Sequence, residues 1–215
     1  MNYAETVAKD LLEINAVTLR PDQPYTWASG LHSPIYTDNR LTISYPAVRQ
    51  AIYRGMTALI KEHFPTATVI AGTATAGIPH AAWVAEEMQL PLVYVRSKPK
   101  DHGRGKQIEG VLQPGQEVVV IDDLISTGGS VLNAVAAVNK AGAKVVGVVA
   151  VFTYQLPAAD RNFAAQGLKY YAVTNYPTLV NVAQKQGLIS ADHLASLKDW
   201  RQDPAEWSSR HAAND

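Results

Sequence analysis

The sequence lacks cysteine, an excess of charge and long apolar runs. Without Cys among its 215 residues, disulfides, thiolate catalysis and zinc–thiolate sites are excluded. Lys plus Arg and Asp plus Glu both number 19, so the formal charge is zero, which argues against a nucleic-acid binder. No window approaches the roughly 18 consecutive apolar residues of a membrane span, and no signal-peptide segment opens the chain. We therefore expect a cytoplasmic protein without nucleic-acid or membrane partners.

The sequence also lacks internal repeats, low-complexity runs and an interdomain linker. Its six His and its carboxylates show no spacing typical of a fixed metal site. The length suits one well-buried α/β domain with a small addition. We expect one domain over residues 1–215, in three parts: an N-terminal helix and hood at about 1–45, an α/β core at about 46–190, and a C-terminal helix and tail at 191–215.

The most informative stretch of the chain is 117–130. The β-branched run 118–121 predicts a strand buried on both faces. Asp122 and Asp123 follow where this strand should end, and a turn of hydroxyl residues and glycines occupies 126–130. Apolar residues then recur at helical spacing. The stretch therefore predicts a strand, an acidic pair, a glycine–hydroxyl loop and a helix.

This combination suits a phosphorylated sugar. Gly128 and Gly129 allow backbone N–H groups to close around a phosphate, and the following helix adds its positive dipole end. The acidic pair can accept hydrogen bonds from sugar hydroxyls, bind Mg²⁺ and stabilise positive charge on a nearby carbon. The loop is neither a Walker loop nor a dinucleotide turn. The alternative is an ordinary strand-to-helix turn with a solvated acidic pair. The hydroxyl residues that can add donors are Ser126, Thr127 and Ser130.

The remaining pattern predicts an α/β fold with a central parallel sheet of about five strands. A helix is expected at 2–14, and two short strands around a Ser29-Gly30 turn should form a hood. The next helix begins near Pro46. Strands are predicted at 68–71, 92–95, 117–121, 144–153 and 169–173, helices at 78–88, 130–140, 157–166, 177–186 and 191–202, and a loosely ordered tail at 203–215.

Three loops should meet at one site, because ligands bind beyond the carboxyl ends of parallel strands. These are loops 72–77, 96–110 and 122–130. Loop 96–110 concentrates basic residues and glycines, which suits a lid that closes on a polyanion, although a solvated charged loop is the alternative. Loop 72–77 is either a backbone clamp for a diphosphate or a plain turn.

Residues 118–130 resemble the phosphoribosyl diphosphate motif of the type I phosphoribosyltransferases: apolar residues, two acids, two variable residues, then a hydroxyl-rich glycine loop. The hood segment 29–36 and the Arg-x-x-x-Lys-Asp-His-Gly pattern at 96–103 resemble the orotate phosphoribosyltransferases, over about residues 5–190. This resemblance implies transfer of ribose 5-phosphate from phosphoribosyl diphosphate to orotate, giving orotidine 5′-phosphate and pyrophosphate in pyrimidine synthesis. It further implies Mg²⁺ held mainly through the substrate, and a homodimer whose lid reaches the partner's site.

The resemblance also implies roles for individual residues. Asp122, Asp123, Lys100 and His102 would be catalytic, and Ser126 would touch orotate. Phosphoribosyl diphosphate would be bound by Arg96, Lys100, His102, Asp122, Asp123, Leu124, Ile125, Ser126, Thr127, Gly128, Gly129 and Ser130.

The chain departs from the family pattern at four positions where many members have Lys or Arg: Ala28, Ala76, Ser97 and Tyr154. Asp38 and Arg40 are equally compatible with a structural ion pair and with a substrate contact. Two other functions stay open. One is a phosphoribosyltransferase for another base, and the other is a non-catalytic sensor of phosphoribosyl diphosphate that regulates transcription.

Overall fold

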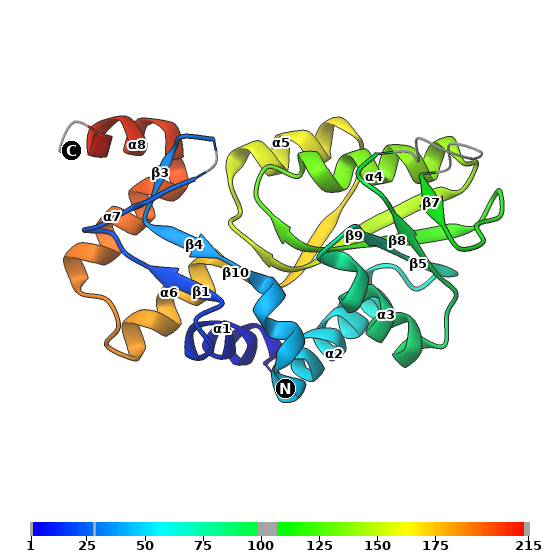
Figure 1. The fold of residues 1–215 in the computed structure, drawn as a ribbon, viewed down its shortest axis with the longest axis horizontal. Coiled ribbons are helices and arrows are strands. Elements are labelled where there is room, and N and C mark those ends of the chain that lie inside the picture. The colour runs from blue at the N-terminus through cyan, green and yellow to red at the C-terminus, as the bar shows by residue number, and fades with distance from the viewer. Residues whose placement is uncertain (1, 28, 99–106, 213–215) are drawn as a thin grey trace.

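The computed structural model describes residues 2–27, 29–98 and 107–212, and a six-stranded sheet lies at its centre (Figure 1). The strand order is β10-β9-β8-β5-β6-β7, and every neighbouring pair is parallel except β6 and β7. The predicted α/β fold with five parallel strands is therefore confirmed. The sequence did not predict β7, because a strand of two residues is too short to show an alternation of apolar and polar side chains. The strands are β5 (Val69–Thr73), β6 (Leu92–Val95), β7 (Ile108–Glu109), β8 (Glu117–Ile125), β9 (Lys144–Thr153) and β10 (Tyr170–Asn175).

Helices cover both faces of this sheet. Val119 and Ile121 of β8 pack in one core cluster with α1 (Tyr3–Glu13), α2 (Pro46–His63) and α3 (Gly77–Met88). Val118 and Val120 face the opposite cluster with α4 (Gly129–Lys140) and α5 (Pro157–Ala165). Burial on both faces explains why β8 reads as a continuous β-branched run. No helix in the described ranges is long and apolar enough to cross a membrane.

The hood forms a separate lobe beside the β10 edge of the sheet (Figure 1). It contains two antiparallel strand pairs, β1 with β4 and β2 with β3. The predicted pair of strands around the Ser-Gly turn corresponds to β2 and β3. The elements of this lobe are β1 (Val17–Leu19), β2 (Tyr25–Thr26), β3 (His32–Ser33), β4 (Ile35–Thr37), η1 (Asn39–Ser44), α6 (Tyr176–Lys185), α7 (Ala191–Gln202) and α8 (Pro204–Ala212).

The C-terminal segment is helical, so the prediction of a loose tail was wrong for α8. Asp203 accepts hydrogen bonds from the backbone N–H groups of Ala205 and Glu206, which stabilises the start of this helix. Trp207 is fully buried and donates its indole N–H to Ser196 Oγ at 3.1 Å. Ser208 Oγ accepts the backbone N–H of His32 at 2.8 Å. The helix therefore completes the hood, through a contact between two residues that lie 176 positions apart in the sequence.

Candidate active site

The acidic pair lies inside strand β8, which corrects the prediction that the strand ends before it. Pairing with β5 stops at Gly72 opposite Ile121, but pairing with β9 continues to Ile125 opposite Thr153. Because β9 is ten residues long, it supports β8 beyond the end of β5. Asp122 and Asp123 therefore project from a rigid strand at the carboxyl edge of the sheet, where the turn had been expected.

Burial dominates the electrostatics of this pair. Asp122 is only 6% exposed, and burial raises the pKa of its carboxyl well above the usual range, with the charge of Asp123 adding to the effect. Burial also raises the pKa of Asp123, whereas a hydrogen bond from Asp122 and the positive charge of Arg40 lower it. The backbone N–H of Asp123 donates to Asp122 Oδ1 at 2.9 Å. Such a pair favours a ligand that brings hydroxyl donors or positive charge.

The glycine loop forms an open cradle at the start of α4. Gly128 is the N-cap residue of α4 with a φ of +83°, and no side chain caps this helix. The first N–H groups of an uncapped helix are available to an anion. Asn162 of α5 supports the loop by donating to the Thr127 carbonyl at 2.9 Å. A cavity of about 140 Å³ is lined by Asp122, Leu124, Ser126, Thr127, Gly128, Gly129, Ser130 and Val131.

The two glycines of the loop have different surroundings. A Cβ on Gly128 would lie 2.6 Å from Cε2 of Phe163, whereas a Cβ on Gly129 would meet nothing closer than Thr127 Oγ1 at 3.9 Å. Gly128 is therefore required by its positive φ and by the ring packed against it. No local pattern indicates the contact with Phe163, because this residue lies on α5, 35 residues further along the chain.

Loop 72–77 lies directly beside the acidic pair. A Cβ on Gly77 would come within 2.6 Å of the Ile121 carbonyl oxygen and 3.2 Å of Asp122 Cα, so α3 begins pressed against β8. The Ala74–Thr75 peptide within this loop is cis. A cavity of about 50 Å³ joins the loop to the start of the predicted lid and to α4, and its lining residues are Thr73, Ala74, Val95, Arg96, Ser97, Gln107, Ser130, Asn133 and Ala134.

The two ends of the predicted lid are held together by short-range contacts. The Arg96 backbone N–H donates to the Gln107 carbonyl at 2.9 Å, and Gln107 Nε2 returns a bond to the Arg96 carbonyl at 2.9 Å. Arg96 Nη1 lies 3.6 Å from Glu109 Oε1. Two predicted site residues, Lys100 and His102, lie outside the described residues, as does Ala28.

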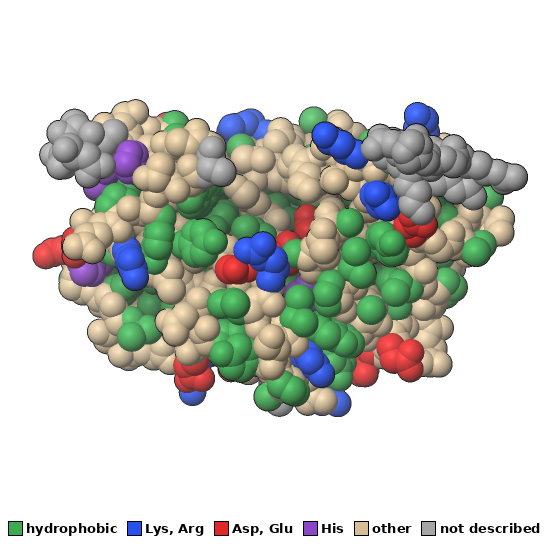
Figure 2. Space-filling model, in the orientation of Figure 1, with side chains coloured by type: hydrophobic (Ala, Val, Ile, Leu, Met, Phe, Trp, Pro, Cys, Tyr) green, Lys and Arg blue, Asp and Glu red, His purple; other side chains and the backbone are tan. Residues whose placement is uncertain are grey.

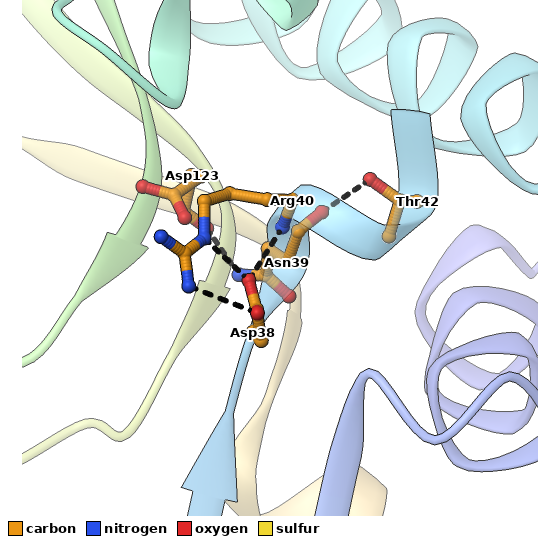
Figure 3. Close-up of polar contacts among 5 residues, drawn as sticks. All are labelled: Asp38, Asn39, Arg40, Thr42 and Asp123. Atoms are coloured by element: carbon orange, nitrogen blue, oxygen red, sulfur yellow. Dashed lines mark hydrogen bonds and ion pairs between the residues drawn. The ribbon is translucent and has the colours of Figure 1, made fainter. Parts of the chain in front are cut away.

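The hood contacts the acidic pair through the start of η1 (Figure 3). Asn39 Nδ2 donates to the backbone carbonyl of Asp123 at 2.7 Å. Arg40 forms a two-point ion pair with Asp38, with Nε–Oδ1 at 2.6 Å and Nη2–Oδ2 at 2.9 Å. Sequence reasoning left open whether Asp38 and Arg40 form an ion pair, and it missed Asn39, whose partner lies 84 residues away.

A third cavity, of about 350 Å³, lies between hood and core. Ser126, the residue predicted to touch orotate, lines it together with residues of both lobes. Tyr154 is only 3% exposed, donates its hydroxyl to Thr37 Oγ1 at 3.0 Å and stacks on Trp27. Tyr154 therefore joins the lobes and supplies no positive charge. The cavity is lined by Trp27, Leu31, Ser126, Thr127, Leu156, Pro157, Ala158, Arg161, Gln202, Asp203, Pro204 and Ala205.

Comparison with known proteins identifies the class to which this fold and site belong. The phosphoribosyl transferase domain family matches residues 45–186, more than half of the chain, so the chain belongs to this family. It is 63% identical over 204 residues to an orotate phosphoribosyltransferase of Lactiplantibacillus plantarum, covering 95% of this chain and 96% of the relative. It is 56% identical over 207 residues to an orotate phosphoribosyltransferase of Streptococcus thermophilus, covering 96% and 99%.

Solved structures agree with this assignment. The orotate phosphoribosyltransferase of Aeropyrum pernix superposes with a TM-score of 0.74 at 27% identity, over 86% of this chain and 99% of that one. The Mycobacterium tuberculosis H37Rv orotate phosphoribosyltransferase in complex with phosphoribosyl diphosphate has a TM-score of 0.64 at 28% identity, over 83% and 99%. Within the family, the chain thus groups with the orotate phosphoribosyltransferases, pentosyltransferases of pyrimidine nucleotide synthesis, as its sequence motifs indicated.

Proposed function

We propose that this chain joins orotate to phosphoribosyl diphosphate at Asp122 and Asp123, producing orotidine 5′-phosphate and pyrophosphate. The observation that carries this proposal is that the acidic pair borders two loops. Asp122 lines the cradle of about 140 Å³ at the start of α4, and Gly77 at the end of loop 72–77 packs against Asp122 Cα. A sugar with phosphates at both ends fits this order, with its ribose on the carboxylates.

In the proposed reaction, orotate N1 loses its proton to solvent and attacks the anomeric carbon while the bond to pyrophosphate breaks and its electron pair leaves with the diphosphate. The sugar gains oxocarbenium character, as in other glycosyl transfers. Asp122 and Asp123 accept hydrogen bonds from the ribose hydroxyls and stabilise this positive charge. The four residues that hold the 5′-phosphate are Thr127, Gly128, Gly129 and Ser130.

The departing diphosphate gains negative charge, and we assign its neutralisation to Arg96, Lys100 and His102. Mg²⁺ fits the same part of the site, because Asp122 and Asp123 offer the oxygen donors that this ion prefers. Within the described residues, no three His, Asp or Glu side chains gather to hold a metal. The substrate's diphosphate and hydroxyl oxygens would therefore supply most ligands. When bound, the ion would offset the charge of the leaving group.

We further propose a homodimer in which each lid serves the partner's site. Figure 2 shows hydrophobic side chains over the region of η1, α2 and α3. Leu41 and Tyr45 in this region are 42% and 45% exposed, which suits a surface covered by a second copy. A phosphorylated sugar does not cross membranes unaided, so we place the enzyme in the cytoplasm.

Shared sites can be tested by mixing Lys100→Ala with Asp123→Asn, each nearly inactive alone. Random exchange makes half of the dimers mixed, and each mixed dimer has one intact site, so activity should return to about a quarter of wild type. Sites confined to single chains would show no recovery after verified subunit exchange.

The reaction itself is tested by incubating the protein with phosphoribosyl diphosphate, Mg²⁺ and orotate, with adenine and uracil as alternative bases. Formation of orotidine 5′-phosphate that depends on all three components supports the proposal. A faster reaction with adenine would identify a phosphoribosyltransferase for another base. Binding of phosphoribosyl diphosphate without turnover of any base would favour the non-catalytic regulator.

A further inference from the structure

The strand order determines from which side the base approaches the sugar. β8, with the acidic pair, lies between β5 and β9 in the sheet. β5 leads into loop 72–77, which the proposed function assigns to the diphosphate. β9 ends at Thr153, and the hydroxyl of the next residue, Tyr154, bonds to Thr37 of the hood. An in-line displacement places the incoming base opposite the leaving group. On the proposed function, therefore, the base must enter from the hood side.

The charge of the base creates a problem at this location. Orotate carries its carboxylate on the ring carbon bonded to N1, the atom that attacks the sugar. The carboxylate must therefore lie close to the ribose and to Asp122 and Asp123. Like charges at such short range repel, and partial burial strengthens the repulsion. A cation on the hood side of Asp123 is needed, and Tyr154 cannot provide it.

Arg40 has the required position. Asn39 anchors the start of η1 to the Asp123 carbonyl, and Figure 3 shows the Arg40 guanidinium lying between the carboxylates of Asp38 and Asp123. Asp38 binds Nε and Nη2, which leaves Nη1 and one Nη2 hydrogen for another ligand. The Arg40 side chain is 66% exposed, so the fold does not enclose its free donors. A pre-oriented guanidinium of this kind is suited to a carboxylate.

We propose that Arg40 binds the carboxylate of orotate, and that Asp38 is the positioning residue that holds its guanidinium at the acidic pair. The rival cation is Arg161, which lines the cavity of about 350 Å³ with Ser126. Arg40 is favoured because the carboxylate must lie beside the reacting nitrogen, and of these two arginines Arg40 is the one next to Asn39, which anchors η1 to the Asp123 carbonyl. The chain thus carries on η1 a positive charge that position 154 lacks.

The test compares two product nucleotides that differ only in the carboxylate. Calorimetry would measure the binding of orotidine 5′-phosphate and uridine 5′-phosphate to wild type, Arg40→Ala, Arg40→Lys and Arg161→Ala. Arg20→Ala is the matched control, since Arg20 is also a hood arginine but stacks on Tyr25. Circular dichroism and thermal unfolding would verify the fold of each variant.

We expect Arg40→Ala to weaken orotidine 5′-phosphate binding by about 10- to 100-fold, the usual effect of removing a charged hydrogen-bond partner, and to leave uridine 5′-phosphate binding within about threefold. Arg40→Lys should restore part of the difference. Equal weakening of both nucleotides, or loss of the preference in Arg161→Ala only, would overturn the assignment. A wild type that does not prefer orotidine 5′-phosphate would instead count against orotate as the substrate, which keeps the two failures separate.

Discussion

The neighbouring glycines of the phosphate cradle should respond in opposite ways to the same substitution. Gly128→Ala places a methyl group on a residue with a φ of +83° and within 2.6 Å of the Phe163 ring. Gly129→Ala adds the same methyl group in the first turn of α4, where nothing lies closer than 3.9 Å. The two variants therefore separate two reasons for having glycine: the constraints of the fold at Gly128, and the space that a bound phosphate requires at Gly129.

The expected cost of Gly128→Ala has two parts. A left-handed backbone costs a residue with a side chain about 1–2 kcal/mol, and overpacking a well-filled core costs about 1–3 kcal/mol. The free energy of unfolding should therefore fall by about 2–5 kcal/mol. Gly129→Ala should be neutral or stabilising by up to about 1 kcal/mol, because Ala is the better helix former.

Urea unfolding would measure both variants, and calorimetry would measure phosphoribosyl diphosphate binding at a temperature where both are folded. In the Gly128→Ala/Phe163→Leu double variant the smaller side chain should relieve the overpacking, whereas the cost of the left-handed backbone remains. The double variant should therefore lose less stability than the sum of the two single variants, which a double-mutant cycle measures as a coupling energy. Equal stability of Gly128→Ala and wild type would refute the reasoning. If Gly129→Ala has wild-type stability in urea but binds phosphoribosyl diphosphate weakly, the phosphate cradle requires a glycine without a Cβ at position 129.

Three further predictions follow from the acidic pair and from α8. Asp123→Asn should lower kcat by about 100-fold with the fold retained, as expected for one electrostatic stabiliser, and turnover within threefold of wild type would argue against this role. Burial raises the folded-state pKa of Asp122. The favourable contribution of this carboxyl to the free energy of unfolding is therefore fully present below about pH 4, the pKa of an unfolded Asp, and is lost as pH rises through the folded pKa. Asp122→Asn should therefore gain stability over wild type as pH rises, and a pH-independent difference in urea unfolding would contradict this. Trp207→Ala should lose about 3–5 kcal/mol in the same assay while Ser209→Ala on the same helix stays near wild type, and equal stability of the two would show that α8 is not part of the core.

Much of the site was predictable because its residues lie close together in sequence. Segment 117–130 carries its strand, its acids, its cradle glycines and its helix start within one supersecondary unit, and each has a local signature. The end of β8 was misplaced because β9 decides it, through pairing that reaches Thr153. The requirement for Gly128 was attributed to the ligand alone, since the Phe163 ring becomes visible only when α5 packs on the sheet.

The sequence by itself determined the α/β class, the positions of most helices and strands, and the phosphoribosyl diphosphate motif, because periodicity and turn chemistry are local properties of the chain. Tertiary structure alone decided how the hood meets this motif. Asn39 anchors η1 to Asp123, Tyr154 bonds to Thr37, and Ser208 of α8 bonds to His32 of β3. Each of these contacts joins residues that are distant in sequence, and their selection depends on burial and shape, which no local pattern records.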